Sequence, residues 1–124
     1  MKDSKNIKIA ISSLPEGGWW DKGIVAYQDN DMMSNDAVPN QSLLQQEHKG
    51  LIEILNKHSL PIEIIPFKKD LEIIKKYDFV FMRDHFLCNV DKDIVMCNMK
   101  LSERMNEGEF VISSLKDLQY NVSF

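Results

Sequence analysis

Asp78-Phe79-Val80-Phe81-Met82-Arg83-Asp84 is the most informative stretch of this chain of 124 residues. Its apolar residues are consecutive over 79–82, and the run ends abruptly in two opposite charges. A short, continuous apolar run is typical of a strand that is buried on both faces, as in a parallel sheet. The sequence therefore predicts a buried strand over 79–82, with Arg83 and Asp84 placed where the strand emerges from the core.

The segment after this charge pair has the pattern of a hairpin followed by a helix and a strand. Two mainly apolar runs at 86–89 and 94–97 flank the turn 90–93, which predicts a β-hairpin. A long helix is predicted to start at Leu101. Its expected inner stripe is Leu101, Met105, Ile112, Leu115 and Leu118. The alternation over 120–124 predicts a further strand.

The segment before the charge pair predicts a strand, a helix and a second strand. The strands are expected at 7–11 and 62–67, and the helix at 41–58, with Asn40 or Ser42 as its N-cap. Strand, helix and strand in this order indicate a right-handed crossover unit of an α/β fold. The expected inner stripe of the helix is Leu44, His48, Leu51 and Leu55, with His48 as a locally hydrogen-bonded histidine at the edge of the core. A short helix, 71–76, capped by Asp70, is predicted to follow.

Residues 15–40 form a long irregular stretch that contains Trp19 and Trp20. Connections of this length inside a compact domain are usually functional lids or disordered. The adjacent tryptophans argue against disorder, because the fold should bury at least one ring. Two interpretations stay open, a packed surface loop and a loop that covers a substrate.

Composition and charge restrict the class of protein. Apolar residues make up 44% and charged residues 27% of the chain, as in soluble globular proteins, and the net charge is −4. The negative charge argues against binding to nucleic acid or to an anionic membrane. Lys8 interrupts the apolar run 7–14, which therefore predicts neither a signal peptide nor a membrane span. We expect a cytoplasmic protein in which Cys88 and Cys97 are reduced, buried thiols that bind no metal.

The charges around the apolar run are suited to ligand binding. A carboxylate such as Asp84 pairs with a planar cation through two parallel hydrogen bonds, which fits a guanidinium ligand. Arg104 lies near a predicted helix start, where the helix dipole disfavours a cation, and this points to a ligand carboxylate. The alternatives are a local partner for Asp84, such as Arg83, and an exposed ion pair for Arg104. Asp78 has the same strand parity as Asp84, although six strand residues span roughly 20 Å.

The order of these features resembles the amino-terminal part of the guanidino-modifying enzymes, the penteins. This superfamily includes dimethylarginine dimethylaminohydrolase, arginine deiminase and the amidinotransferases. The segment 78–84 resembles its Asp-x-Val-Phe-x-x-Asp motif, and Arg104-Met105-Asn106-Glu107 resembles its Arg-x-x-Glu pair. The predicted helix 41–58, with Gln46 and His48, is also similar.

The resemblance implies a partial α/β-propeller of ββαβ modules, about two of five, in which 1–124 is a single domain or the amino-terminal fragment of a larger propeller. It implies that Asp84 holds the guanidinium of arginine or a methylated arginine, that Arg104 holds the substrate carboxylate, and that Asp78 and Arg83 line the same pocket. Neither a metal nor an organic cofactor is implied.

The resemblance also implies that the catalytic histidine and cysteine of these enzymes lie in a carboxy-terminal half beyond this chain. None of the cysteines and histidines present matches their positions: Cys88, Cys97, His48, His58 and His85. We therefore expect no catalytic residue in 1–124 and no turnover by this chain alone. The expected partners are a small guanidino substrate and either a missing carboxy-terminal half or further copies of this chain.

Two other functions compete with this interpretation. One is a small non-catalytic α/β module that binds a ligand or a protein. The other is a flavodoxin-like domain, which is disfavoured because Gly17-Gly18 is followed by two tryptophans and not by a helix that would bind phosphate. Hydrolysis and amidino transfer both remain open, as does the identity of the guanidine.

Overall fold

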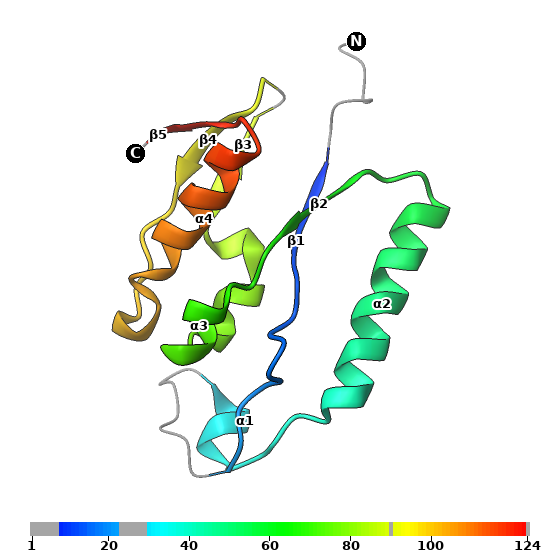
Figure 1. The fold of residues 1–124 in the computed structure, drawn as a ribbon. Coiled ribbons are helices and arrows are strands. Elements are labelled where there is room, and N and C mark those ends of the chain that lie inside the picture. Colours follow the sequence, from blue (N-terminus) through cyan, green and yellow to red (C-terminus); the bar gives the residue numbers. More distant parts are fainter. Residues whose placement is uncertain (1–7, 23–29, 90, 124) are drawn as a thin grey trace.

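The computed structural model describes residues 8–22, 30–89 and 91–123 and contains two small β-sheets with helices around them (Figure 1). The strands are β1 (Ile9–Ser12), β2 (Ile62–Ile65), β3 (Phe86–Cys88), β4 (Asp93–Met96) and β5 (Asn121–Ser123). The α-helices are α1 (Asp31–Ser34), α2 (Gln41–Lys57), α3 (Lys69–Ile73) and α4 (Glu107–Asp117). Short 3₁₀ helices are η2 (Tyr77–Val80), η3 (Met82–Asp84) and η4 (Ser102–Arg104). The predicted mixed α/β class is confirmed.

The first sheet joins β1 and β2 in parallel, with α2 as the crossover between them. Asn40 is the N-cap of α2, because its side chain accepts a hydrogen bond from the Leu43 amide at 3.0 Å. His48 Nε2 lies 2.8 Å from the carbonyl oxygen of Ser12, so the partly buried histidine has a structural contact, but its partner is 36 positions away and ties α2 to the end of β1. The predicted inner stripe of α2 is wrong at Leu51, which is exposed to solvent (47%).

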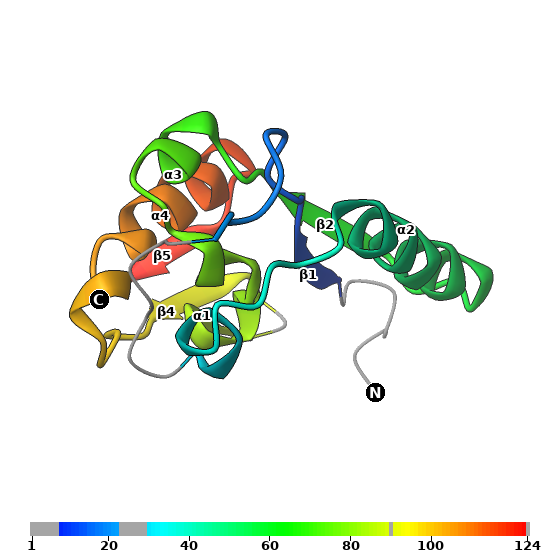
Figure 2. The same ribbon diagram turned by 90° about the horizontal axis from the view of Figure 1, so that it is seen from below.

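The second sheet has the strand order β3-β4-β5. β3 and β4 pair antiparallel, as the predicted hairpin requires, and β5 pairs with β4 in parallel after the crossover through α4. The predicted final strand is confirmed over 121–123, while residues 7, 90 and 124 of the predicted elements lie outside the described part. Figures 1 and 2 place α2 on one side of the β1–β2 pair and the second sheet with α4 on the other.

The predicted buried strand over 79–82 is wrong, because this segment forms the 3₁₀ helices η2 and η3. Phe79 and Met82 are buried, whereas Phe81 between them is 53% exposed. This spacing of three matches the period of a 3₁₀ helix. A short apolar run alone does not distinguish it from a strand that is buried on both faces. Asp84 therefore ends a 3₁₀ helix and not a strand.

Two helix boundaries also differ from the predictions. α4 begins at Glu107 and not at Leu101, since η4 occupies 102–104 and Met105 is 64% exposed. α3 covers 69–73, and Asp70 lies within its first turn without capping it. Before α4, the residues at the expected start form the separate 3₁₀ helix η4. In α3, the expected cap Asp70 is already part of the helix.

One hydrophobic core joins the two sheets with α3, α4 and the 3₁₀ segment. Its buried residues are Ile65, Phe67, Leu71, Phe79, Met82, Ile94, Val111 and Leu115. They come from β2, the segment after it, α3, η2, η3, β4 and α4, so the core fixes the 3₁₀ segment between the first crossover unit and the hairpin. A second cluster contains Trp20, Met33 and Tyr77.

Cys88 and Cys97 are both free thiols. Cys88 pairs with Ile94 across the hairpin, and it is exposed, so its predicted burial is wrong. Partial desolvation of its sulfur, together with the nearby Asp93 carboxylate, raises the pKa of the Cys88 thiol. Among the described helices, none combines the length and apolarity needed to cross a lipid bilayer.

Candidate functional site

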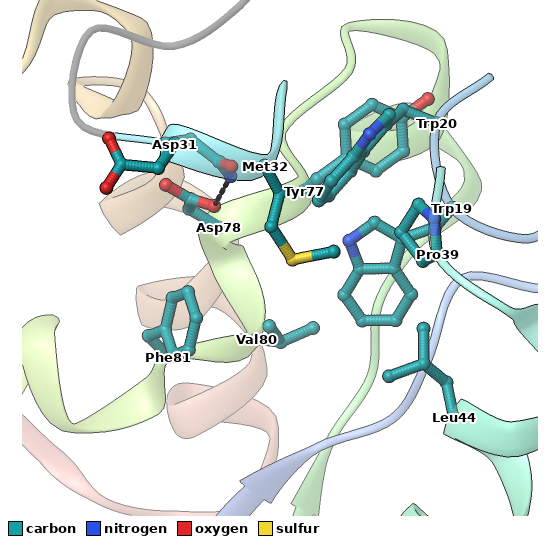
Figure 3. A pocket seen from close by; sticks show the side chains of 11 residues that line it. Trp19, Trp20, Asp31, Met32, Pro39, Leu44, Tyr77, Asp78, Val80 and Phe81 are labelled. Carbon is teal, nitrogen blue, oxygen red and sulfur yellow. Dashed lines mark hydrogen bonds between the residues drawn. The ribbon is translucent and has the colours of Figure 1, made fainter. Parts of the chain in front are cut away.

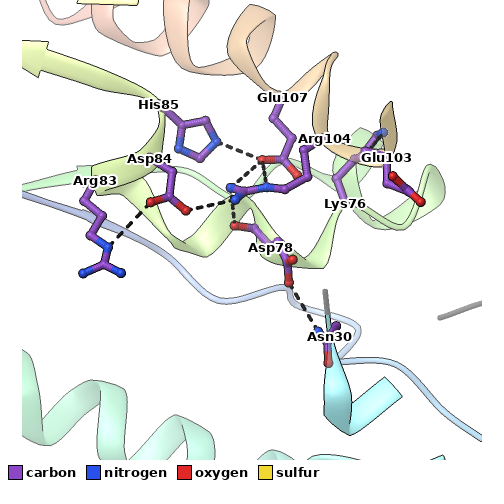
Figure 4. A network of polar contacts seen from close by, with 9 residues as sticks. All are labelled: Asn30, Lys76, Asp78, Arg83, Asp84, His85, Glu103, Arg104 and Glu107. Carbon is purple, nitrogen blue, oxygen red and sulfur yellow. Dashed lines mark hydrogen bonds and ion pairs between the residues drawn. The ribbon is translucent and has the colours of Figure 1, made fainter. Parts of the chain in front are cut away.

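Arg104 is the centre of a network of polar contacts between η2, η3, η4 and α4 (Figure 4). Its Nη1 donates to Asp84 Oδ2 at 2.9 Å, and its Nη2 donates to the Asp78 carbonyl oxygen at 2.9 Å. Its Nε donates to Glu107 Oε2 at 3.0 Å, and Nη2 is also 3.0 Å from that oxygen. Arg104 is only 8% exposed, so its position is fixed by protein groups on several sides.

The 3₁₀ conformation explains how Asp78 and Asp84 reach the same arginine. An extended strand would separate them by roughly 20 Å, whereas a 3₁₀ helix rises only about 2 Å per residue. The observed conformation therefore brings the backbone of Asp78 and the side chain of Asp84 to two nitrogens of one guanidinium.

Glu107 and His85 form the buried end of this network. Both side chains are fully buried, and His85 Nε2 lies 3.0 Å from Glu107 Oε2. Oε2 thus has three nitrogen neighbours, while Glu107 Oε1 and His85 Nδ1 are buried and have no hydrogen-bond partner among the described residues. No role for Glu107 was predicted from the sequence, although its position three residues after Arg104 is the spacing of an Arg-x-x-Glu pair.

Charge and burial act in opposite directions on this cluster. Burial raises the pKa of the Asp78 carboxyl above its ordinary value, Arg104 opposes that rise, and Glu107 and Asp84 add to it. Burial alone would lower the pKa of Arg104, but the hydrogen bonds that Arg104 donates to Glu107 and Asp84 outweigh this effect and raise that pKa. Arg104 is therefore a permanent cation, whereas burial disfavours the ionised form of Asp78.

A pocket of about 390 Å³ adjoins the Asp78 side of the network (Figure 3). Most of its lining is aromatic or apolar, and its carboxylates are Asp31 and Asp78. The lining residues are Trp19, Trp20, Asn30, Asp31, Met32, Pro39, Leu44, Tyr77, Asp78, Val80 and Phe81. Asn30 Nδ2 lies 3.5 Å from Asp78 Oδ1 at the pocket wall. Acidic groups within aromatic walls are suited to a flat or alkylated cation.

Hydrogen bonds hold the aromatic wall of this pocket in place. The Trp19 amide donates to Gln41 Oε1 at 2.7 Å, and Trp20 Nε1 donates to the Ala37 carbonyl oxygen at 2.8 Å. Trp20 also packs edge-on against Tyr77, with ring centroids 5.7 Å apart. The predicted irregular stretch 15–40 thus contains a fixed wall and the short helix α1, while its residues 23–29 lie outside the described part.

The four residues predicted to bind substrate occupy different positions. Asp78 lines the pocket, while Asp84 and Arg104 lie in the adjoining network. Arg83 is 92% exposed at its side chain, and its Nε is 3.6 Å from Asp84 Oδ1. The structure therefore brings Asp78, Asp84 and Arg104 together and leaves Arg83 at the surface. Their contact with a substrate stays a prediction.

Comparisons with known proteins show a family for this sequence and a similar fold among solved structures. The family model "N,N dimethylarginine dimethylhydrolase, eukaryotic" matches residues 23–123. Among solved structures, the binary complex of the AgrE C264A mutant with L-arginine is similar, with a TM-score of 0.67 and 18% sequence identity. The match covers 94% of this chain and 16% of that protein, and it shows the fold alone. No curated protein matches the sequence. Because the family model spans most of the sequence, the chain belongs to the eukaryotic N,N-dimethylarginine dimethylhydrolase family.

Proposed function

We propose that this chain forms the amino-terminal part of an amidinohydrolase or amidinotransferase that acts on the guanidino group of arginine or a methylated arginine. The observation that carries the proposal is the partly buried Asp78 carboxylate at the wall of an aromatic pocket of about 390 Å³. Membership of the dimethylhydrolase family supports this substrate class.

The fold supports the same proposal. β3, β4, α4 and β5 follow one another as strand, strand, helix and strand, which is the order of a ββαβ module. We assign this unit to a partial α/β-propeller, of which the chain supplies about two modules in five. The nucleophilic cysteine and the acid–base histidine then belong to other modules, and the described chain contributes binding groups.

Asp78 is the group proposed to hold the guanidinium. Its raised pKa reflects desolvation that a bound cation would offset, since an opposite charge favours the ionised form. Trp19 and Phe81 flank the same space and offer π faces to a planar cation. Asp84, whose side chain is 35% exposed, supplies a second carboxylate beside this site.

Arg104 takes part as a support for these carboxylates. Its contacts with Glu107, Asp84 and the Asp78 carbonyl engage all three of its nitrogens. A substrate carboxylate would reach Arg104 by displacing Asp84 from Nη1 or by using the second hydrogen on that nitrogen. Arg83 is proposed to line the outer rim, where its exposure allows contact with the polar end of a ligand.

Isothermal titration calorimetry with arginine, N,N-dimethylarginine and agmatine tests this proposal. The wild-type chain should release heat with the guanidines and not with citrulline, whose ureido group is neutral. Asp78→Asn should abolish the heat, while Glu53→Gln, on an exposed carboxylate of α2, should retain it. Equal heats for citrulline and arginine, or for Asp78→Asn and wild type, would contradict the proposal.

The alternative is a non-catalytic α/β module that binds a protein. The outer face of α2 favours it, because Leu43, Leu51 and Ile54 are each about half exposed. An uncovered apolar helix face is typical of an interaction surface. Light scattering of the purified chain, with Leu51→Lys as the comparison, separates the two functions. Self-association that this substitution abolishes, without any binding of guanidines, would favour the interaction module.

A further inference from the structure

We infer that His85 is a positioning residue for the guanidinium site, because it fixes Glu107 and through it the Arg104 guanidinium that supports Asp84. The inference deepens the proposed function and rests on it for the role of Asp84. It assigns a task to a buried histidine that neither the pocket nor the core requires.

The contacts form a continuous path from the core to the site (Figure 4). His85 Nε2 is 3.0 Å from Glu107 Oε2, which in turn is 3.0 Å from Arg104 Nε. Arg104 Nη1 then reaches Asp84 Oδ2 at 2.9 Å. Exposure rises along this path, from fully buried side chains at His85 and Glu107 to 35% at Asp84. The orientation of Asp84 is therefore set from inside the protein.

The hydrogen-bond chemistry defines the state of the imidazole. An ionised carboxylate only accepts hydrogen bonds, so in this proposal Glu107 is ionised and His85 Nε2 is the N–H donor of this hydrogen bond. Glu107 Oε1 has no partner among the described residues, so the carboxylate is held through Oε2 alone. Without the donor on His85, Glu107 Oε2 keeps only its two contacts with Arg104 among the described residues, so the Glu107–Arg104 pair loses the hydrogen bond that ties it to the core.

Packing alone does not account for a histidine at this position. The ring contacts Phe79, with centroids 5.2 Å apart, in surroundings that an apolar side chain would also fill. His85 Nδ1 is buried without a partner among the described residues, which disfavours the fold. The His85 backbone, by contrast, is well anchored, since its carbonyl oxygen accepts from the Cys97 amide at 2.8 Å. Because its backbone is held in this way, the His85 ring starts from a fixed position, as a positioning role requires.

Two amide substitutions test the inference on the full chain. In His85→Gln the side-chain amide falls near the position of Nε2 and keeps a donor for Glu107, whereas in His85→Asn it falls near Nδ1 and does not reach. Nitrogen-15 NMR measures solvent exchange of the Arg104 Nε proton without any ligand. We expect exchange about tenfold faster in His85→Asn and within about twofold of wild type in His85→Gln. A purely structural role would affect both variants alike.

The outcomes separate this inference from the proposed function. Equal exchange rates in the two variants would overturn the inference, whether or not arginine binds. The expected rates together with no binding of guanidines by wild type would keep the positioning role and remove the proposed function. If neither variant folds, the nitrogen-15 shifts of wild-type His85 decide, because a neutral ring protonated only at Nδ1 overturns the inference.

Discussion

The Arg104 guanidinium lies 2.9 Å from the Asp84 carboxylate and joins the end of η3 to the end of η4 across 20 positions of sequence. The same arginine contacts Glu107, which is fully buried at the start of α4, so one side chain links the 3₁₀ segment to α4. A buried carboxylate that loses its cationic partner is strongly destabilising. The stability of the fold and the geometry of the proposed site therefore depend on the same residue.

Arg104→Met should destabilise the chain by about 3–5 kcal/mol, because it leaves Glu107 as an uncompensated buried charge. Arg83→Met is the matched control, since the Arg83 side chain is 92% exposed and its loss should change stability by no more than about 0.5 kcal/mol. Urea unfolding monitored by tryptophan fluorescence measures both. Similar unfolding midpoints for the two variants would show that the Arg104 network contributes little.

Asp78→Asn should stabilise the protein at neutral pH while it removes guanidine binding. Burial raises the folded-state pKa of Asp78 above its ordinary value of 3.8, against the opposing effect of Arg104. A carboxyl group with a raised folded pKa favours folding below its ordinary pKa, and this contribution is lost as the pH rises through the folded value. At pH 7 the ionised form therefore opposes folding.

We expect the free energy of unfolding of Asp78→Asn to exceed that of wild type by at most about 1 kcal/mol at pH 7. The gain should disappear as the pH falls below the ordinary Asp78 pKa of 3.8, because the wild-type carboxyl is then protonated in both states. Urea titrations at several pH values measure it, with Glu53→Gln as an exposed control. A gain that is constant across this range would exclude a titrating Asp78 as its cause.

The elements predicted correctly from sequence are those with strong local signals. α2 combines a periodic apolar pattern with the Asn40 cap, and the hairpin has β-type runs on both sides of a polar turn. These features depend on neighbours within a few residues. The parallel pairing of β1 with β2 then follows from the crossover rule.

The failures concern segments whose conformation depends on distant groups. The apolar run 79–82 suits a strand and a 3₁₀ helix equally well, and the structure selects the form in which the Asp78 carbonyl meets Arg104. The pocket wall could not be predicted from the sequence either, because the Trp19 amide is held by Gln41, 22 residues away. Neither contact has a signal in the local sequence. The pairing of Glu107 with Arg104, in contrast, could have been predicted from their Arg-x-x-Glu spacing.

Trp20→Phe should destabilise the protein by about 2–4 kcal/mol, because it leaves the Ala37 carbonyl without its donor and opens a cavity beside Tyr77. Trp20 is 6% exposed, whereas Trp19 is half-buried. Trp19→Phe keeps the backbone hydrogen bond to Gln41 and should cost less than half as much. Thermal unfolding followed by circular dichroism compares them. A larger loss for Trp19→Phe would mean that Trp19 is the structural ring of the pair.

Two glycine-to-alanine substitutions should have effects of opposite sign. Gly18 has a φ of +89°, and a Cβ there would lie 3.1 Å from Gln41 Oε1, so Gly18→Ala strains the backbone and disturbs the group that holds the Trp19 amide. We expect it to cost about 1–3 kcal/mol.

Gly50 lies within α2, and a Cβ there meets nothing within 4 Å. Gly50→Ala should therefore stabilise the chain by about 0.5–1 kcal/mol through higher helix propensity. Urea unfolding of both variants at one pH provides the comparison, and tryptophan emission reports whether the pocket wall has moved. Destabilisation by Gly50→Ala would indicate that the outer face of α2 is covered closely in solution, as the interaction-module alternative requires.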